Sequence, residues 1–220
     1  MSDTDAFDIH RNTVYEYNEN GLLSKKTQYN VDGTVWEQEI YSYDQNNNLI
    51  KVQNSDISWD EYAYNSDNQL LWIRSYYDGR SHYNVSYVYD EKGNMLTETD
   101  ALGNTTTYTY DSNDNVLGIT DAMGNKTEYT YNSRGQMLTE TDPMGNTTTN
   151  TYDEKGNLTS IKDSKGNITS FAYDSKGNLG KMTDPQGNTT SYTYDSNGNI
   201  LSKTDSKGNT TTYTYDAVGN

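Results

Sequence analysis

Short stretches in which polar and aromatic residues alternate recur along much of the chain. Residues 105–110 read TTTYTY and residues 189–194 read TTSYTY. Thr and Tyr both favour strands, and their alternation has the period of two that a β-strand requires. Aliphatic residues lie on the intervening stretches, where each series begins directly after the last turn residue, which is Asn in every case but Gln136. These first positions are Met95, Val116, Met137, Leu158, Leu179 and Ile200. The pattern predicts short strands and, in this half of the chain, no helix.

A turn signal separates each predicted strand from the next. Every repeating unit holds two such signals, for example DSNGN at 195–199 and DSKGN at 205–209. The Asp that opens the turn can accept hydrogen bonds from nearby backbone N–H groups. The Gly three residues later suits a left-handed backbone position. Because successive turns are alternately 10 and 11 residues apart, strands of about six residues remain between them.

The two turns and two strands together form a unit that repeats every 21 residues. Tyr-Asp pairs begin at Tyr89, Tyr110, Tyr152, Tyr173, Tyr194 and Tyr215, and Tyr131-Asn132 fills the one gap. Upstream, Tyr17, Tyr43, Tyr64 and Tyr89 follow one another at steps of 26, 21 and 25 residues. We therefore divide the chain into residues 1–88, a degenerate part of the array with a possible cap, and residues 89–220, the regular repeats.

The repeat length conflicts with simple strand pairing. If both turns paired their Asp with the following Asn, equivalent residues two strands apart would be separated by 22 positions, whereas the sequence repeats at 21. An uncorrected sheet would exchange its two faces at every unit. We therefore predict either one β-bulge per repeat or two turns of different type, and a coiled sheet, because bulges bend strands. We also expect each repeat to place at least one aliphatic residue on each of the two faces of the sheet.

Composition alone would indicate disorder. The chain is 31% hydrophobic and carries a net charge of −16, a combination that seldom buries enough apolar surface to fold. The regular recurrence of aliphatic positions argues for a folded protein. The acidic balance argues against nucleic acid as a partner, because phosphates are neutralised by Lys and Arg. No run approaches 18 apolar residues, so we expect no membrane span.

Candidate catalytic chemistry is sparse. The chain has no Cys, and its two His residues, His10 and His82, lie outside any repeated context. Asp opens nearly every regular turn, and this regularity favours a role in capping turns over a calcium site, which needs several oxygen ligands. We predict no enzymatic activity, no cofactor and no metal site.

The three tryptophans all lie in the irregular half of the chain. Trp36, Trp59 and Trp72 are followed by Tyr76 and Tyr77. These five residues could pack together or cap one end of the sheet, as terminal repeats must. They could instead form a ligand patch, because exposed aromatic rings stack on sugars and on partner surfaces. Both interpretations remain open at this stage.

The repeats resemble the YD-repeat family, also called Rhs repeats. The motif YDxxGNxxxxTDxxGNxTxYxYD reads directly from Tyr89 to Asp111. The resemblance is strong over residues 89–220 and weak over 10–88. It implies a long β-sheet that spirals into a hollow shell or solenoid, as in bacterial polymorphic toxins, insecticidal toxin complexes, wall-associated proteins and teneurins. The resemblance also implies that, in the toxins of this family, the shell encloses a variable C-terminal toxin domain.

This resemblance implies a non-catalytic structural segment of a large bacterial protein, secreted or at the cell surface. Its expected partner is a C-terminal effector or toxin domain of the full-length protein. No segment after Tyr215 resembles the one that closes the shell in toxins, so we expect a fragment of a longer chain. The alternative function is an adhesin-like module that binds carbohydrate or a cell surface. A weaker alternative is pairing of open sheet edges between chains.

Overall fold

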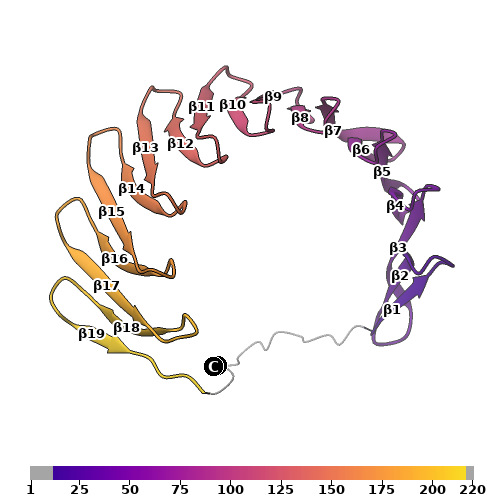
Figure 1. Cartoon of the computed structure of the whole chain (residues 1–220). Helices are drawn as coiled ribbons and strands as arrows, with labels where there is room; N and C mark the ends of the chain where they lie inside the picture. The colour runs from indigo at the N-terminus through magenta and orange to yellow at the C-terminus, as the bar shows by residue number, and fades with distance from the viewer. Residues whose placement is uncertain (1–11, 217–220) are drawn as a thin grey trace, which may run out of the picture. The chain divides into compact units, whose positions relative to one another are not determined.

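The computed structural model describes residues 12–216, which form 19 strands and no helix (Figure 1). Each strand pairs antiparallel with the next strand in sequence, and all 19 belong to one sheet. The predicted all-β fold of tandem antiparallel hairpins is therefore confirmed. Contacts divide the chain into a first unit that ends at Thr107 and a second that begins at Tyr108. This division is separate from the change in sequence regularity at residue 89.

The strands of the first unit are longer and less uniform than those that follow. They are β1 (Asn12–Tyr17), β2 (Leu23–Tyr29), β3 (Val35–Tyr43), β4 (Leu49–Ser55), β5 (Ser58–Tyr64), β6 (Leu70–Tyr77), β7 (Arg80–Tyr89) and β8 (Met95–Thr99). The division between the units falls within β9 (Thr105–Tyr110).

The strands of the second unit alternate between five and six residues until the last. They are β10 (Val116–Thr120), β11 (Lys126–Tyr131), β12 (Met137–Thr141), β13 (Thr147–Tyr152), β14 (Leu158–Lys162), β15 (Ile168–Tyr173), β16 (Leu179–Thr183), β17 (Thr189–Tyr194), β18 (Ile200–Thr204) and β19 (Thr210–Thr212). The lengths match the strands of about six residues that the turn spacing predicts.

Both turns of a repeat close with the same hydrogen bonds. The Asp153 N–H donates to the Asn157 carbonyl at 2.9 Å, and the Gly156 N–H donates to the Asp153 carbonyl at 3.0 Å. The Asp153 carboxylate also accepts the N–H groups of Lys155 and Asn157, at 2.9 and 2.8 Å. The turn that begins at Asp163 has the same set of bonds. The opening Asp thus satisfies backbone donors that the turn would otherwise leave to water.

The fourth residue of these turns adopts a left-handed backbone conformation. Gly187, for example, has a φ of +84°. Asn47, Asn68 and Asp114 occupy the same position in their turns with φ of 66°, 60° and 66°. Asn and Asp are the residues other than Gly that tolerate this region best. The predicted role of the turn glycine is therefore confirmed.

The first and fifth residues of most turns are chemically matched. Where Asp opens the turn, the fifth residue is Asn, and its amide donates to the carboxylate, as Asn178 does to Asp174 at 2.9 Å. Asn132 opens its turn instead and donates its amide to the Gln136 side-chain oxygen at 3.0 Å. Asn65 does the same to Gln69 at 2.8 Å. In these two turns an amide at the first position meets an acceptor at the fifth, whereas the turn that Asn18 opens has Leu22 there.

One residue per regular repeat lies outside the hydrogen-bonded ladder. Thr130 pairs with Thr139, but the next residue, Tyr131, pairs with Met137, so Leu138 is the extra residue of a bulge. The hairpin closed by the other turn shows no such shift. The same shift recurs at Tyr152, Tyr173 and Tyr194. The prediction of one bulge per repeat is confirmed, and since the two turns are alike, the alternative of different turn types is not.

The bulge gathers tyrosines and aliphatic residues on one face. Directly opposed residues share a face, as Tyr131 does with Met137 and Tyr129 with Glu140. Leu138 lies two residues before Glu140 and so belongs to the same face. Our expectation that these aliphatic residues divide between the two faces is therefore wrong, because the extra residue restores Leu138 to the side of Met137.

We call this side the tyrosine face, because in both units it carries the Tyr that precedes a bulged turn. Tyr29 is the exception, since it lies on the opposite side with Thr27 and Gln38. The opposite side is the threonine face. In the second unit it consists largely of Thr and Ser, which hydrogen-bond across strands. The hydroxyl oxygens of Thr130 and Thr139 lie 2.6 Å apart, and those of Thr141 and Thr147 lie 3.0 Å apart.

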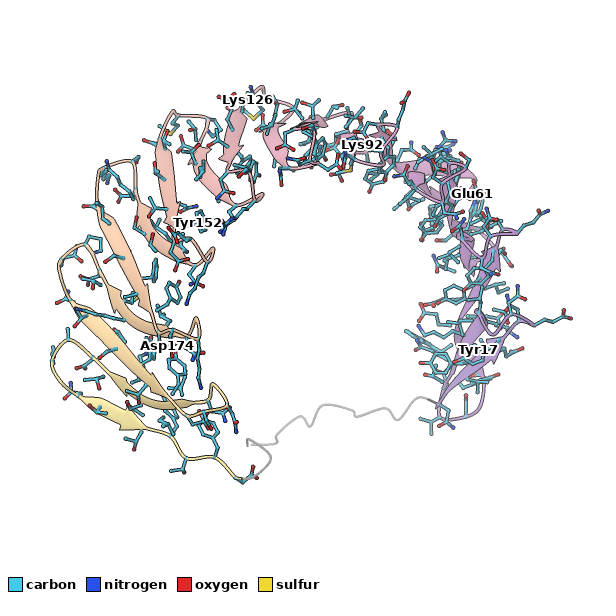
Figure 2. All side chains as sticks on the ribbon, in the orientation of Figure 1. Tyr17, Glu61, Lys92, Lys126, Tyr152 and Asp174 are labelled. Carbon is cyan, nitrogen blue, oxygen red and sulfur yellow. The ribbon has the colours of Figure 1, made fainter. Side chains whose placement is uncertain are left out.

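Figure 2 shows the side chains standing on both faces of a single layer of strands. Of the residues whose burial is described, only Thr27, Val52, Val85, Gly118 and Asn150 are buried. The tyrosines and aliphatic residues of the tyrosine face are mostly half-buried by their neighbours along the sheet. Stability therefore depends on contacts between adjacent repeats, as in other repeat proteins, and on cross-strand pairs worth about 0.2–1 kcal/mol each.

The Tyr of each Tyr-Asp pair connects its repeat to the preceding one. The Tyr152 hydroxyl donates to the Met137 carbonyl at 2.8 Å, and the Tyr173 hydroxyl donates to the Leu158 carbonyl at 2.9 Å. Met137 and Leu158 are residues of the bulge, where the ladder is interrupted. The Asn150 amide also donates to the Met137 carbonyl, at 3.2 Å. The hydroxyl therefore satisfies an acceptor beside the bulge, which gives this Tyr a structural role.

Candidate functional site on the first unit

The three tryptophans lie on the threonine face of the first unit. Gln53 pairs with Trp59 and Trp59 pairs with Tyr76, so these residues share a face. Trp72 belongs to it because Ala63, its partner, is four residues after Trp59 on the same strand. Trp36 belongs to it because Ile40, four residues later on β3, pairs with Gln53. The strand period of two thus brings Trp36, Trp59, Trp72 and Tyr76 to one face.

Trp59 is held by neighbours on the sheet. Its ring stacks on Tyr76 with centroids 5.0 Å apart and planes inclined by 12°. The Lys51 ammonium lies 4.9 Å from the Trp59 ring centroid, and the indole N–H donates to a Glu61 carboxylate oxygen at 3.1 Å. These contacts stabilise the side chain in one position. Trp59 therefore fits the packing interpretation.

Trp72 is also covered by a neighbour. The Arg74 guanidinium lies 4.3 Å from the Trp72 ring centroid, close enough for a cation–π contact. Tyr77 is separate from this group, because it alternates with Tyr76 along β6 and so lies on the tyrosine face. Its ring makes an edge contact with His82, with centroids 6.0 Å apart. Four of the five predicted patch residues thus share the threonine face, and Tyr77 lies on the other face.

Trp36 has a different setting, at the rim of an open hollow of about 490 Å³. Its side chain is 48% exposed. The hollow is lined by Val35, Trp36, Glu37, Gln38, Ile40, Gln53, Asn54, Ser55 and Asp56. Amides, carboxylates and one indole ring thus surround a single concave site. Sequence reasoning identified Trp36 but missed the polar residues, because Gln53 and Asn54 come from a different strand.

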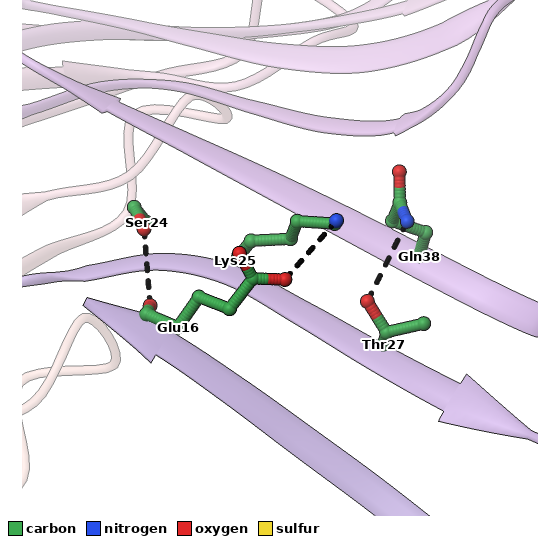
Figure 3. A network of polar contacts seen from close by, with 5 residues as sticks. All are labelled: Glu16, Ser24, Lys25, Thr27 and Gln38. Atoms are coloured by element: carbon green, nitrogen blue, oxygen red, sulfur yellow. Dashed lines mark hydrogen bonds and ion pairs between the residues drawn. The ribbon is translucent and has the colours of Figure 1, made fainter. Parts of the chain in front are cut away.

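Figure 3 shows the polar contacts on strands β1 to β3, of which the one made by Gln38 reaches the hollow. The Gln38 amide donates to the Thr27 hydroxyl at 3.5 Å, a long contact, and Thr27 is only 1% exposed. Lys25 forms an ion pair with Glu16 at 3.1 Å, and the Ser24 hydroxyl donates to the Glu16 carbonyl at 3.1 Å. The Gln38 side chain therefore contacts Thr27 on the neighbouring strand and also lines the hollow.

On the tyrosine face of the same strands, Glu39 links two side chains. It accepts hydrogen bonds from the Tyr41 hydroxyl and from the Lys26 ammonium, the latter at 3.0 Å. The Tyr41 hydrogen bond holds the pKa of Glu39 below its ordinary value. Burial, reinforced by Glu39, raises the pKa of Tyr41 to about 12. Both groups keep their ordinary charge at neutral pH, so the trio is a structural contact.

Other chemistry is sparse in residues 12–216. Among them no three His, Cys, Asp or Glu side chains are grouped as a metal ion would require. Within the same residues no helix could cross a bilayer. His10, one of the two histidines considered above, lies outside the described residues.

Comparison with known proteins gives the family. The sequence profile described as Teneurin YD-shell matches residues 61–220. The chain belongs to the Teneurin YD-shell family. The YD-shell match begins beyond the hollow around Trp36, which is lined by residues 35–56. No curated protein matches the chain.

Solved structures show the same fold. A crystal structure of TcdB2-TccC3 has a TM-score of 0.65 and 19% identity over 94% of this chain. One of TcdB2-TccC3-Cdc42 has a TM-score of 0.57 and 17% identity, also over 94%. This chain covers only 14% and 16% of those chains. The likeness, at these identities, concerns the fold alone: the chain is a segment with YD-shell architecture.

Proposed function

We propose that this chain is part of the wall of a larger YD-shell that encloses or presents an effector domain of the full-length protein. The observation that carries the proposal is the tyrosine face. Its half-buried Tyr and aliphatic side chains recur in successive repeats, interrupted by polar residues such as Glu140 and Asn150, and no second layer of described residues covers them. A face on which apolar side chains recur in this way favours an enclosed surface or a bound partner.

The proposed role is structural and not enzymatic. The recurring residues all have structural tasks: Asp and Asn close turns, Gly permits the left-handed turn position, and Tyr satisfies the carbonyl beside the bulge. A wall also needs no cofactor. We place the protein outside the cell or at its surface, as part of a large bacterial protein, with the enclosed effector as its partner.

The first test is the sequence of the source gene beyond codon 220. We expect a segment that closes the shell, followed by an unrelated C-terminal domain. Limited proteolysis of that full-length protein should then leave the C-terminal domain intact until the sheet is unfolded. A full-length protein without such a domain, or one whose C-terminal domain is digested as fast as the isolated domain, would contradict the proposal.

A second candidate is a module that binds carbohydrate or a cell surface. The observation that favours it is the aromatic group on the threonine face of the first unit, together with the hollow at Trp36. A gene that continues into a wall-anchoring tail, with no effector, would favour this candidate over the first. Binding of the protein to intact cells or to glycans measures it directly.

A further inference from the structure

The three tryptophans of the first unit have different settings, and Trp36 borders a concave polar site. Tyr76 and Lys51 contact Trp59, and Arg74 contacts Trp72. Trp36 is 48% exposed and lines the hollow between β3 and the end of β4. We propose that this hollow binds a neutral sugar, with one pyranose ring stacked on Trp36. The inference deepens the second candidate function and does not depend on an enclosed effector.

The aromatic and aliphatic residues of the hollow provide an apolar surface. Trp36 is flanked by Val35 and Ile40, which are 54% and 42% exposed. One side of a pyranose ring presents C–H groups, which pack against the face of an indole ring. Exposed apolar side chains next to one another on a strand cost free energy of solvation unless something covers them. A sugar ring covers a surface of this size.

The polar residues of the hollow suit hydroxyl groups. The Gln53 amide nitrogen donates to the Ser55 carbonyl at 3.3 Å. The oxygen of the same amide can then accept a hydrogen bond from a ligand. Neither Asn54 nor Asp56 has a side-chain hydrogen bond to any described residue. A sugar hydroxyl donates and accepts, so it can pair with amide and carboxylate groups alike. Small-molecule sites commonly combine an apolar wall with a few such groups.

The charge of the hollow selects a neutral ligand. Its lining includes the carboxylates Glu37 and Asp56 and no Lys or Arg. The whole chain carries a net charge of −16, which repels anions at long range. Uronic acids, sialic acids and sulfated sugars are therefore excluded. Because the site is open and contacts one face of a ring, we expect a dissociation constant on the order of 1 mM for a short oligosaccharide.

The test is saturation-transfer NMR and titration calorimetry on the full chain with cellohexaose and maltohexaose, and with oligogalacturonate as the acidic comparison. We expect binding of a neutral oligosaccharide and none of oligogalacturonate. Trp36→Ala should weaken the neutral binding at least about tenfold, the typical effect of removing one aromatic contact. Tyr192→Phe, an aromatic substitution in the second unit at the position where the preceding repeat has Phe171, is the control and should change affinity less than about twofold.

A second variant keeps the test informative if Trp36→Ala alters the fold. Gln53→Leu preserves size but removes the amide, and it should also weaken binding while circular dichroism stays unchanged. If neither neutral oligosaccharide binds the parent chain at the solubility limit, the sugar site and the carbohydrate form of the second candidate both fail. If one neutral oligosaccharide binds and neither Trp36→Ala nor Gln53→Leu changes its affinity, the sugar does not bind in the hollow. The second candidate function would survive that result. Equal binding of oligogalacturonate would overturn the charge argument.

Discussion

The first and second units use the same hairpin and differ in what their threonine faces carry. In the second unit this face holds Thr and Ser in nearly every strand, as in β12 and β17. In the first unit the same face holds Trp36, Trp59, Trp72 and Tyr76 with Lys51 and Arg74. The tyrosine face and the five-residue turn recur in both, although β4–β5 and β6–β7 of the first unit are joined by shorter turns. The shared features therefore specify the sheet, and the face that varies is where a specific function can be added.

The largest expected effect separates the packed tryptophan from the one at the hollow. Trp59→Ala removes the stack on Tyr76 and the contacts with Lys51 and Glu61. We expect a loss of about 2 kcal/mol in the free energy of unfolding, below the range for fully buried tryptophans because the ring is half-buried. Trp36→Ala should cost clearly less, because the Trp36 side chain is 48% exposed. Urea unfolding measures both, and equal losses would remove the distinction between the two residues.

The turns offer a second comparison, because two turns of the first unit place Asn at the fourth position, where most turns of the second unit place Gly. At Gly187 a Cβ atom would meet nothing within 4 Å, so the left-handed φ of +84° is the only obstacle to a side chain. Gly187→Ala should cost about 1–2 kcal/mol. Gly187→Asn should cost clearly less, as Asn47 and Asn68 adopt this conformation. Thermal unfolding checks the order, and an Ala variant as stable as the parent would refute the backbone argument.

A smaller effect concerns the hydroxyl that reaches the preceding repeat. Tyr173→Phe removes the donor to the Leu158 carbonyl and should cost about 0.5–1.5 kcal/mol, the usual net value of one hydrogen bond. Tyr192→Phe is the control, because Phe occupies the equivalent position of the preceding repeat, at Phe171. That substitution should be close to neutral. Denaturant titration of the two variants would show equal effects if the hydroxyl contributes nothing.

The smallest effect is the dependence on acid. The Asn178 amide and backbone N–H bonds hold the pKa of Asp174 below its ordinary value, and the same holds for Asp153, Asp163 and Asp195 with their own partners. A carboxyl whose pKa is lower in the folded state stabilises the fold above its unfolded pKa, about 3.9. That contribution is lost as pH falls through the lower, folded value.

Turns that open with Asn should not respond to acid in this way. Asn18, Asn30 and Asn65 open three turns of the first unit, whereas Asn132 opens the only such turn among the described turns of the second. Amide hydrogen exchange below about pH 4 should therefore accelerate more in the turns of the second unit. NMR titration of the Asp174 carboxyl gives its pKa directly. A value at or above the ordinary one would contradict the proposed hydrogen bonding.

Most of the fold follows from spacing alone. The alternation of Thr and Tyr, the Asp and Gly of the turns and the conflict between 21 and 22 residues predicted the strands, the turns and the bulge. The faces could not be assigned correctly, because the position of the bulge decides whether Leu138 lies with Met137 or opposite it. Nor does spacing indicate the Tyr152 hydroxyl bond to Met137, because the two residues are 15 positions apart.

The candidate site was only partly predictable. Aromatic enrichment identified Trp36, Trp59, Trp72 and Tyr76, and the strand period separates Tyr77 from Tyr76. Which ring is covered depends on cross-strand neighbours such as Arg74 beside Trp72, and these require the register. The matching of Asp with Asn, and of Asn with Gln, across the five turn residues was visible in the sequence as paired substitution at Asn132 and Gln136. The reason for this pairing, a hydrogen bond between the first and fifth side chains, is known only from the structure.

The central claim is that a single bulge per repeat places the Tyr and aliphatic residues on one face. Nuclear Overhauser contacts between opposed residues of the isotopically labelled chain test it most directly. The account predicts cross-strand contacts of Thr130 with Thr139 and of Tyr131 with Met137, and the same pair of contacts 21 and 42 residues later. Contacts of Thr130 with Leu138 alongside those of Tyr131 with Met137 would show an unbulged ladder and contradict the account.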